Sequence, residues 1–369
     1  MRKPKVYVVG PFSELAGGVI TFQKNLIEHS DLKERWEFQR YNIVRPPKKQ
    51  KYSAHGYEAF LQSDIRRMAK AIGITSWNLL RFPMVIKDAD VLQIQSSDYY
   101  SFWETSLYAM IAKKMNKAVT MRFGGVFDKF YDSSSTNEQR AIRKFLQYPD
   151  QIIVQSQSWK EYFSQFVDPH KLNIVPNAVP YPPPIPKRKN PIPIALFICT
   201  AEAKRKGIDT VLAAAPQLRG KLRFLFVAAN EEAQKQVREK GLEDMIEMRE
   251  SVPREIMKQE IYPSCDLFLI PSHGEGFPNS MLEAMASGMP IVGSFAGAIP
   301  EVIIPPKNGF LNDANDHKGL ARDILTLIEN KELRLEQGRY NHHLCETTYE
   351  IVNLFRRFDT VWQKAMNEK

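Results

Sequence analysis

Cysteine is scarce in this chain, and long apolar runs are missing from it. The 369 residues hold three cysteines, Cys199, Cys265 and Cys345, an odd number at wide spacings. Such spacings exclude a disulfide framework and a cysteine-based metal site, so we expect buried free thiols in a reducing compartment. No run reaches the roughly 18 consecutive apolar residues of a membrane-spanning helix.

The start of the chain also lacks the apolar core of a secretory signal. Residues 1–5 are basic, but the apolar run that follows them, Val6–Gly10, is too short for a signal peptide and is typical of a first buried strand. We therefore expect a cytoplasmic protein, with peripheral contact at the inner face of a membrane as an open alternative.

Acidic residues are outnumbered only in the first half. Residues 1–180 hold 26 Lys and Arg against 17 Asp and Glu, and residues 181–369 hold 25 of each, so the net charge of +9 belongs to the first half. A basic half is typical of a protein that faces an anionic membrane, a lipid-linked phosphate or an acidic glycan. A scattered, solvated basic surface explains the same count equally well. The basic residues form no nucleic-acid-binding motif, so we expect no nucleic acid partner.

Strand-like and helix-like runs alternate in both halves, which is typical of βαβ units on a mostly parallel sheet. Strands are expected at 5–10, 89–95, 118–123, 151–155, 172–175, 194–199, 222–228, 266–271 and 290–292. Residues 180–193 hold seven prolines, which predicts a stiff, extended connector between two domains. We therefore expect α/β architecture, with Rossmann-like doubly wound domains over 1–179 and 194–348 and a ligand held in the cleft between them.

The strongest chemical signal is Ser272–Glu283. The strand expected to end at Pro271 is followed by a glycine-containing loop, and a helix capped by Asn279 or its neighbour begins after it. Free backbone N–H groups and a helix dipole at the carboxyl edge of a strand suit a diphosphate. Glu275 and Glu283 would repel phosphate, so we expect them to bind vicinal sugar hydroxyls. A solvated loop charge and a helix-stabilising charge are the alternatives.

Three further segments lie at the carboxyl ends of expected strands. Lys204-Arg205-Lys206 can neutralise a diphosphate leaving group, although an exposed basic turn fits as well. Gly17-Gly18 permits close approach of a phosphate but lacks the pattern GxGxxG, and a plain turn is the alternative. The third segment, with Arg122, Gly124 and Gly125, leaves room for an acceptor.

The run Glu275-Gly-Phe-Pro-Asn-Ser-Met-Leu-Glu283 resembles the signature of retaining GT-B glycosyltransferases, in particular glycosyltransferase family 4, the group 1 transferases. The resemblance continues at 295–303 and 307–311 and covers nearly the whole second domain. It implies a GT-B fold in which a C-terminal helix, 349–369, packs back on the first domain. It also implies retaining transfer of a sugar from a UDP- or GDP-type donor to a glycan or lipid-linked acceptor, in cell-surface polysaccharide or glycoconjugate synthesis.

The resemblance also assigns roles to residues. Glu275 would contact the donor sugar and Glu283 the ribose, while Lys206 matches one of two expected diphosphate cations. Thr200 stands where the family has the other cation, so we expect Arg205 or Lys204 to replace it. The expected catalytic set is therefore Glu275, Lys206 and Arg205, and the acceptor set is Arg122, Gly124 and Gly125. The expected donor-binding set is Gly17, Gly18, Gly276, Phe277, Pro278, Asn279, Ser280, Met281, Leu282 and Glu283.

Besides Thr200, one more position departs from the family pattern, and several alternative functions stay open. Phe123 stands where many relatives have a histidine, so the usual catalytic set is incomplete. We expect neither a metal nor a cofactor, with the diphosphate activated by Lys206, the helix dipole and backbone N–H groups. Another GT-B enzyme, such as a phosphorylase or a nucleotide-sugar epimerase, and a non-enzymatic nucleotide-sugar or glycan binder remain rivals. Residues 57–84, which include Arg81 and Trp77, are either a basic amphipathic surface for a membrane or a core-facing helix pair.

Overall fold

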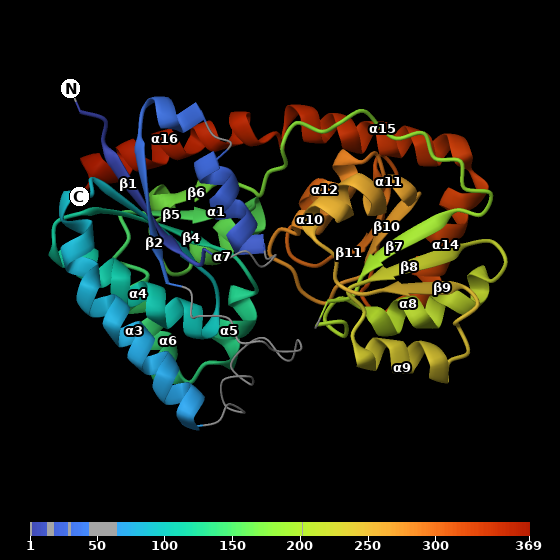
Figure 1. Cartoon of the computed structure of the whole chain (residues 1–369), viewed down its shortest axis with the longest axis horizontal. Coiled ribbons are helices and arrows are strands. Elements are labelled where there is room, and N and C mark those ends of the chain that lie inside the picture. Colours follow the sequence, from blue (N-terminus) through green and yellow to red (C-terminus); the bar gives the residue numbers. More distant parts are fainter. Residues whose placement is uncertain (1, 13–17, 29–30, 44–64, 201) are drawn as a thin grey trace. The chain divides into compact units, whose positions relative to one another are not determined.

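A computed structural model describes residues 2–12, 18–28, 31–43, 65–200 and 202–369 (Figure 1). The chain divides into two compact units, one of residues 1–177 with 351–369 and one of residues 178–350. In the described residues each unit holds one six-stranded sheet whose strand pairs are all parallel, with helices packed on it. The predicted α/β class, with two Rossmann-like doubly wound sheets, is therefore confirmed.

The sheet of the first unit has the strand order β2-β1-β3-β4-β5-β6. Its strands are β1 (Lys5–Gly10), β2 (Glu37–Asn42), β3 (Val91–Ser96), β4 (Ala118–Phe123), β5 (Gln151–Val154) and β6 (Leu172–Ile174). The helices of this unit are α1 (Gly18–Glu28), α3 (Ile65–Val85), α4 (Tyr99–Lys114), α5 (Phe127–Ser133), α6 (Thr136–Phe145), α7 (Gln157–Phe163) and α16 (Ile351–Asn367). The order reverses between β1 and β3, the kind of switch point at which open parallel sheets bind ligands.

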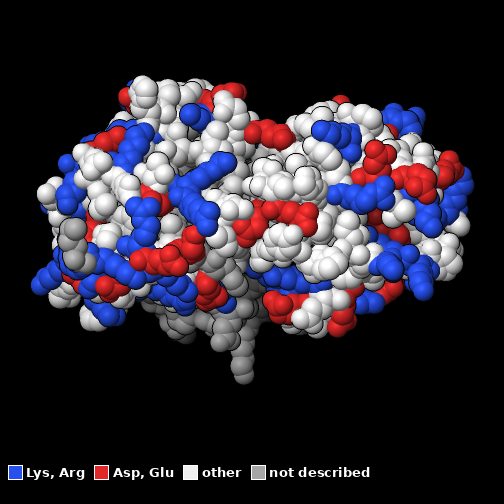
Figure 2. All heavy atoms as spheres, turned by 90° about the horizontal axis from the view of Figure 1, so that it is seen from above, with Lys and Arg blue, Asp and Glu red and all other residues white. Residues whose placement is uncertain are grey.

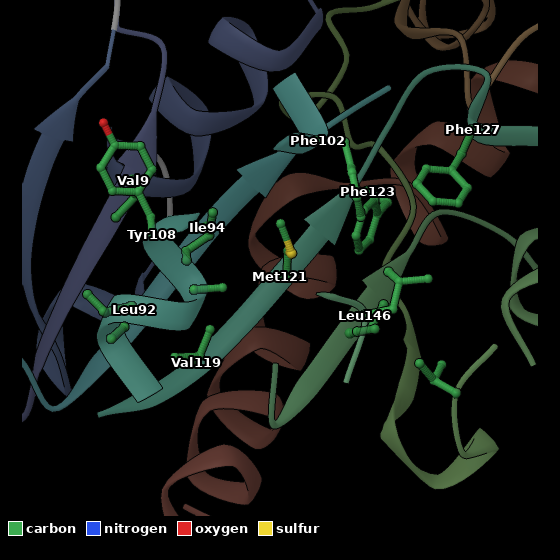
Figure 3. Packing of buried hydrophobic residues seen from close by; sticks show 14 of the residues in the cluster. Val9, Leu92, Ile94, Phe102, Tyr108, Val119, Met121, Phe123, Phe127 and Leu146 are labelled. Carbon is green, nitrogen blue, oxygen red and sulfur yellow. The ribbon is translucent and has the colours of Figure 1, made fainter. Parts of the chain in front are cut away.

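One face of this first sheet is a hydrophobic core (Figure 3). Because side chains alternate along a strand, Met121 and Phe123 leave β4 on the same side. Phe123 lies among other aromatic rings, with its centroid 5.4 Å from that of Phe127 and 4.9 Å from that of Phe163. It is 3% exposed, and it packs in the core while also lining a small pocket beside Gly124 and Gly125.

The opposite face of the first sheet carries several buried polar side chains among apolar ones and is covered in part by α16. Trp362 of α16 donates its indole N–H to Gln93 Oε1 at 2.9 Å, and the hydroxyl of Thr120 donates to the same oxygen at 2.8 Å. Arg122 shares this face with Thr120 and stacks on the ring of Phe22, with 3.7 Å from its guanidinium carbon to the ring centroid. The alternation along β4 thus separates Arg122 from Phe123.

The sheet of the second unit has the strand order β12-β11-β10-β7-β8-β9. Its strands are β7 (Ile194–Ile198), β8 (Arg223–Val227), β9 (Ile246–Arg249), β10 (Leu267–Ile270), β11 (Ile291–Ser294) and β12 (Gly309–Asn312). Its helices are α8 (Ile208–Ala214), α9 (Glu231–Glu239), α10 (Arg254–Ile256), α11 (Tyr262–Ser264), α12 (Asn279–Ala286), α13 (Ile299–Val302), α14 (His317–Glu329) and α15 (Lys331–Thr347), with a π-helical turn at Met257–Ile261. Later strands run outward from β7 on one side and from β10 on the other, so the switch point lies between these two.

The proline-rich segment is not a free connector, because it belongs to the second unit and is tied to it. Arg188 donates to the backbone carbonyls of Gly288, at 3.2 Å, and Ser287. Asn190 donates to Asp266 Oδ2 at 2.7 Å. Proline prevents helix and sheet pairing here, as expected, but side-chain hydrogen bonds fix the segment on its neighbours.

Candidate functional site

The candidate site lies where β7 and β10 end side by side in the second sheet. These two strands are paired with each other, and each begins a separate half of the sheet. The turn at residues 204–207 follows β7, and the loop at residues 271–278 follows β10. Two segments that lie about 70 residues apart in the sequence are therefore brought to the switch point, where ligands of such sheets bind.

Two glycines let neighbouring backbone segments approach the loop at residues 271–278 closely. Gly207 has φ +85°, and a Cβ there would lie 2.0 Å from the carbonyl oxygen of Pro271. Gly297, after β11, has φ +53°, and a Cβ there would lie 1.9 Å from the carbonyl oxygen of Glu275. Only glycine fits such contacts at positive φ. The N–H of His273 donates to the carbonyl of Arg205 at 2.8 Å, which joins the two loops directly.

Glu275 and Lys206 meet in this place. Lys206 Nζ donates to Glu275 Oε1 at 2.7 Å, and the hydroxyl of Ser272 donates to the same oxygen at 2.8 Å. The side chains of Lys206 and Glu275 are 16% and 7% exposed. Glu275 Oε2 receives no hydrogen bond from the residues that the structure describes. One oxygen is therefore fixed by the protein, and the other is free for a hydroxyl of a ligand.

Arg205 is committed to the protein. Its guanidinium donates to the carbonyl of Gly274 and to Glu202, and its Nη1 lies 3.6 Å from Glu275 Oε1. Burial alone lowers the pKa of Arg205, but the neighbouring carboxylates more than offset this, so the pKa lies above its ordinary value. Arg205 thus holds the loop that carries Glu275. Thr200, where the family has a cation, adopts φ +55°, an uncommon conformation for a β-branched residue.

Glu283 is held by two residues that the sequence analysis did not identify. Its Oε1 accepts from Arg254, at 2.8 Å from Nε and 2.7 Å from Nη2, and its Oε2 accepts from the hydroxyl of Tyr262 at 2.9 Å. Burial, together with the charge of Glu283, raises the pKa of Tyr262, so the phenol stays protonated and donates. Arg254 and Tyr262 stand on either side of the π-helical turn, and π-turns often occur at functional sites.

The helix α12 differs in one detail from the prediction. Its N-cap is Pro278, without a side-chain cap, so Asn279 is the first helical residue and not the cap. Pro278 has no side chain that can cap this helix, and a helix N-terminus suits an anion. Met281 and Leu282 are fully buried, so their side chains do not face a ligand.

The residues predicted in the first unit fall into separate places. Gly17 lies outside the described residues, and Gly18 begins α1. Arg122 is 1% exposed and donates to Asn177 Oδ1 at 2.8 Å, and burial lowers its pKa to about 9. Gly124 and Gly125 instead line a small aromatic pocket that Arg122 does not line. The predicted acceptor set is therefore not one cluster.

No group of three or more His, Cys, Asp or Glu side chains suited to a metal occurs in the described part of the chain. The pattern Asp-x-Asp does occur, at Asp88-Ala89-Asp90. These residues precede β3, at the amino edge of the first sheet, and Asp88 accepts from Lys5 at 2.6 Å and from Tyr7 at 2.8 Å. The pair is therefore structural.

Known proteins resemble this chain in sequence and in fold. Residues 192–330 match the family model described as Glycosyl transferases group 1. The chain is 31% identical over 151 residues to the N,N'-diacetylbacillosaminyl-diphospho-undecaprenol alpha-1,3-N-acetylgalactosaminyltransferase of Campylobacter jejuni, covering 40% of this chain and 38% of that protein. It is 32% identical over 168 residues to the MMP alpha-(1->4)-mannosyltransferase of Mycolicibacterium hassiacum, covering 43% and 40%. The matches to these curated relatives thus span about two fifths of their length.

Solved structures show the fold of the whole chain. The sucrose-phosphate synthase of Thermosynechococcus elongatus matches with a TM-score of 0.79 at 16% identity, over 100% of both chains. Anabaena Alr3699/HepE in complex with UDP matches with a TM-score of 0.74 at 15% identity, over 97% of this chain and 99% of that one. The chain therefore has the GT-B fold, and its residues 192–330 match the Glycosyl transferases group 1 model.

Proposed function

We propose that this chain is a retaining hexosyltransferase that moves a sugar from a nucleoside-diphosphate sugar to a glycan or lipid-linked acceptor. The observation that carries the proposal is the pairing of Lys206 with Glu275 at the ends of β7 and β10, next to the start of α12. The cation and the helix N-terminus suit the phosphates of a ligand. The carboxylate of Glu275 suits its hydroxyls, because only one of the two carboxylate oxygens accepts hydrogen bonds from the described residues.

The proposed chemistry is electrostatic. The bond between the anomeric carbon and the diphosphate oxygen breaks, the oxygen of an acceptor hydroxyl bonds to that carbon, and the proton of this hydroxyl passes to the departing diphosphate. Negative charge grows on the departing diphosphate, where Lys206 Nζ and the first N–H groups of α12 stabilise it. Glu275 Oε2 accepts a hydrogen bond from the sugar and sets the position of the anomeric carbon. Arg205 acts through the loop by holding Gly274 and Glu275 in place.

The nucleotide would lie against Glu283. Arg254 and Tyr262 fix this carboxylate from one side, and hydroxyls of a ribose are natural further donors to it. Arg254 also offsets the negative charge that would otherwise repel the diphosphate. We propose that UDP or GDP carries the sugar. The solved complex of HepE with UDP supports a uridine donor.

The acceptor class rests on the relatives. The Campylobacter relative is named for a diphospho-undecaprenol acceptor, and another relative is the putative colanic acid biosynthesis glycosyltransferase WcaL of Escherichia coli, 29% identical over 153 residues. These names support a place for this chain in cell-surface glycan synthesis. We also propose that transfer needs no divalent cation, because Lys206 and α12 supply positive charge at the diphosphate.

The test is an assay of nucleoside diphosphate release from a panel of UDP-, GDP- and ADP-sugars, with polyprenyl-linked and oligosaccharide acceptors. We expect one donor to be turned over, and Glu275→Gln to lower kcat about 100-fold. The matched control is Glu329→Gln, an exposed carboxylate of the same unit, which should leave kcat unchanged. Absence of acceptor-dependent release with every donor would overturn the proposal. Consumption of free phosphate would instead show a phosphorylase.

A further inference from the structure

Helix α3 carries a stripe of exposed apolar side chains. Trp77, Leu80 and Met84 are 60%, 70% and 62% exposed. Their spacing of three and four residues places them on one side of the helix. Phe82 of the same helix is fully buried and packs on Tyr41, with ring centroids 5.0 Å apart. The helix is therefore anchored by one face, and it presents a second apolar face outward.

This stripe stands apart from the rest of the described surface. The other large apolar side chains with high exposure all belong to the second unit, where they are Tyr181, Ile192, Phe295, Ile304 and Leu335. In the described part of the first unit, the exposed large apolar side chains are the three on α3. Single exposed apolar residues need no explanation, whereas a contiguous stripe indicates an interaction surface.

The same helix is rich in positive charge. Its 21 residues include Arg66, Arg67, Lys70 and Arg81 and no Asp or Glu. The guanidinium of Arg81 lies 5.9 Å from the ring centroid of Trp77, and Arg81 forms no ion pair with the described residues. Lys87 lies two residues after the helix, in the 3-10 turn Ile86–Asp88, and is exposed. Arg81 thus lies beside an apolar side chain of the stripe, on a helix that contains further cations.

Outside α3, positively and negatively charged side chains are mixed on the surface that Figure 2 shows. On the faces seen in Figure 2, Lys and Arg side chains are interspersed with Asp and Glu, so they form no single basic patch there. The acid-free helix α3 is therefore a concentrated part of the excess of Lys and Arg in the first 180 residues. An anionic partner is attracted to α3 with little opposing charge from the helix itself.

We propose that the face formed by Trp77, Leu80, Arg81 and Met84, named here the α3 face, docks on the surface of an anionic lipid bilayer. The three apolar side chains would enter the headgroup region, and Arg81 would meet lipid phosphates. No helix in the described residues is long and apolar enough to span a bilayer, so the contact is peripheral. Tryptophan suits this depth, because its ring is apolar and its N–H is polar.

The size of the face favours lipid over protein. Three side chains expose on the order of 400 Å², about half of the roughly 800 Å² that a stable protein partner covers. A membrane needs no matching surface, since apolar insertion and charge attraction add to each other. The inference goes beyond the proposed sugar transfer and does not depend on it.

The experiment is sedimentation of the full chain with vesicles of phosphatidylcholine alone or with 30% phosphatidylglycerol. We expect binding to the anionic vesicles only, and weaker binding in high salt. The double variant L80E/M84E should bind at least about tenfold more weakly, and Arg81→Gln about fivefold more weakly. The matched control is Ile304→Glu, an exposed apolar residue of the second unit, which should bind like the unchanged chain.

Two readouts keep the outcomes separate. Melting temperatures of all variants should agree, because every substituted side chain is exposed, and fluorescence of Trp77 should shift to the blue with anionic vesicles and not in Trp77→Phe. Equal binding of L80E/M84E and Ile304→Glu, or equal binding to neutral and anionic vesicles, would overturn the proposal. So would a dimer in sedimentation velocity that L80E/M84E abolishes, because the face would then join two copies. None of these readouts uses a sugar donor, so they leave the proposed transfer untouched.

Discussion

The substitution Lys206→Met tests how the donor site is held together. It removes the cation 2.7 Å from Glu275 Oε1 but keeps most of the aliphatic side chain. Because both side chains are largely buried, loss of one partner leaves an uncompensated charge and costs about 3 kcal/mol. This is the low end of the usual range, since Arg205 Nη1 stays 3.6 Å from the same oxygen. For a unit the size of residues 178–350, the melting temperature should fall by roughly 6–12 °C.

Differential scanning calorimetry of the second unit's transition in the full chain measures this effect. The matched control is Lys221→Met, which breaks an exposed pair with Glu329, 2.9 Å apart at 55% and 60% exposure, and should leave the melting temperature nearly unchanged. The double variant K206M/E275Q should recover most of the loss, because the unpaired charge is gone. A shift for Lys206→Met no larger than that for Lys221→Met would refute the reasoning, as would simple additivity in the double variant.

Three other predictions concern the loops, the thiols and metals. Gly207→Ala should destabilise the second unit by at least about 3 kcal/mol, because its Cβ would lie 2.0 Å from the oxygen of Pro271. Gly220→Ala, also at positive φ (+77°) but with no atom within 4 Å, should cost only about 1 kcal/mol, and equal losses in urea unfolding would contradict the account. Burial raises the pKa of all three cysteine thiols, so Ellman's reagent should label the native chain slowly and three thiols after denaturation; rapid labelling of the native chain would be inconsistent with burial. EDTA should leave the transfer rate within about twofold, and a loss restored by Mn²⁺ or Mg²⁺ would show that Lys206 and α12 do not suffice.

The sequence indicated the central strands of both sheets and the edge strand β6, but not the edge strands β2, β9 and β12. β1 and β4 have the predicted bounds, because both strands are buried on both faces. The edge strands β2 and β9 carry exposed polar residues, as in Glu37–Asn42, so their patterns resemble loops. Such strands form because they pair with a neighbouring strand, and this pairing depends on the tertiary structure and cannot be read from the local sequence.

The site was predictable in its parts and not in its contacts. Placing Glu275 and Lys206 at carboxyl ends of strands followed from the strand-loop-helix pattern, but their hydrogen bond depends on the pairing of β7 with β10. Arg254 and Tyr262 follow β9 and belong to no motif, so nothing in the sequence connected them with Glu283. The burial of Phe123 could have been predicted from the sequence, because side chains alternate along β4 and Phe123 therefore shares a face with Met121.

The most direct test of the donor site is titration calorimetry of UDP, GDP and ADP with three forms of the chain. We predict that one nucleoside diphosphate binds the unchanged chain at one site. Glu283→Gln should weaken that binding at least about tenfold, because the proposed site places the ribose hydroxyls on Glu283. Glu275→Gln should keep it within about threefold, because Glu275 serves the sugar that a nucleoside diphosphate lacks. Binding of none of the three nucleotides, or equal affinities in the two variants, would contradict the account.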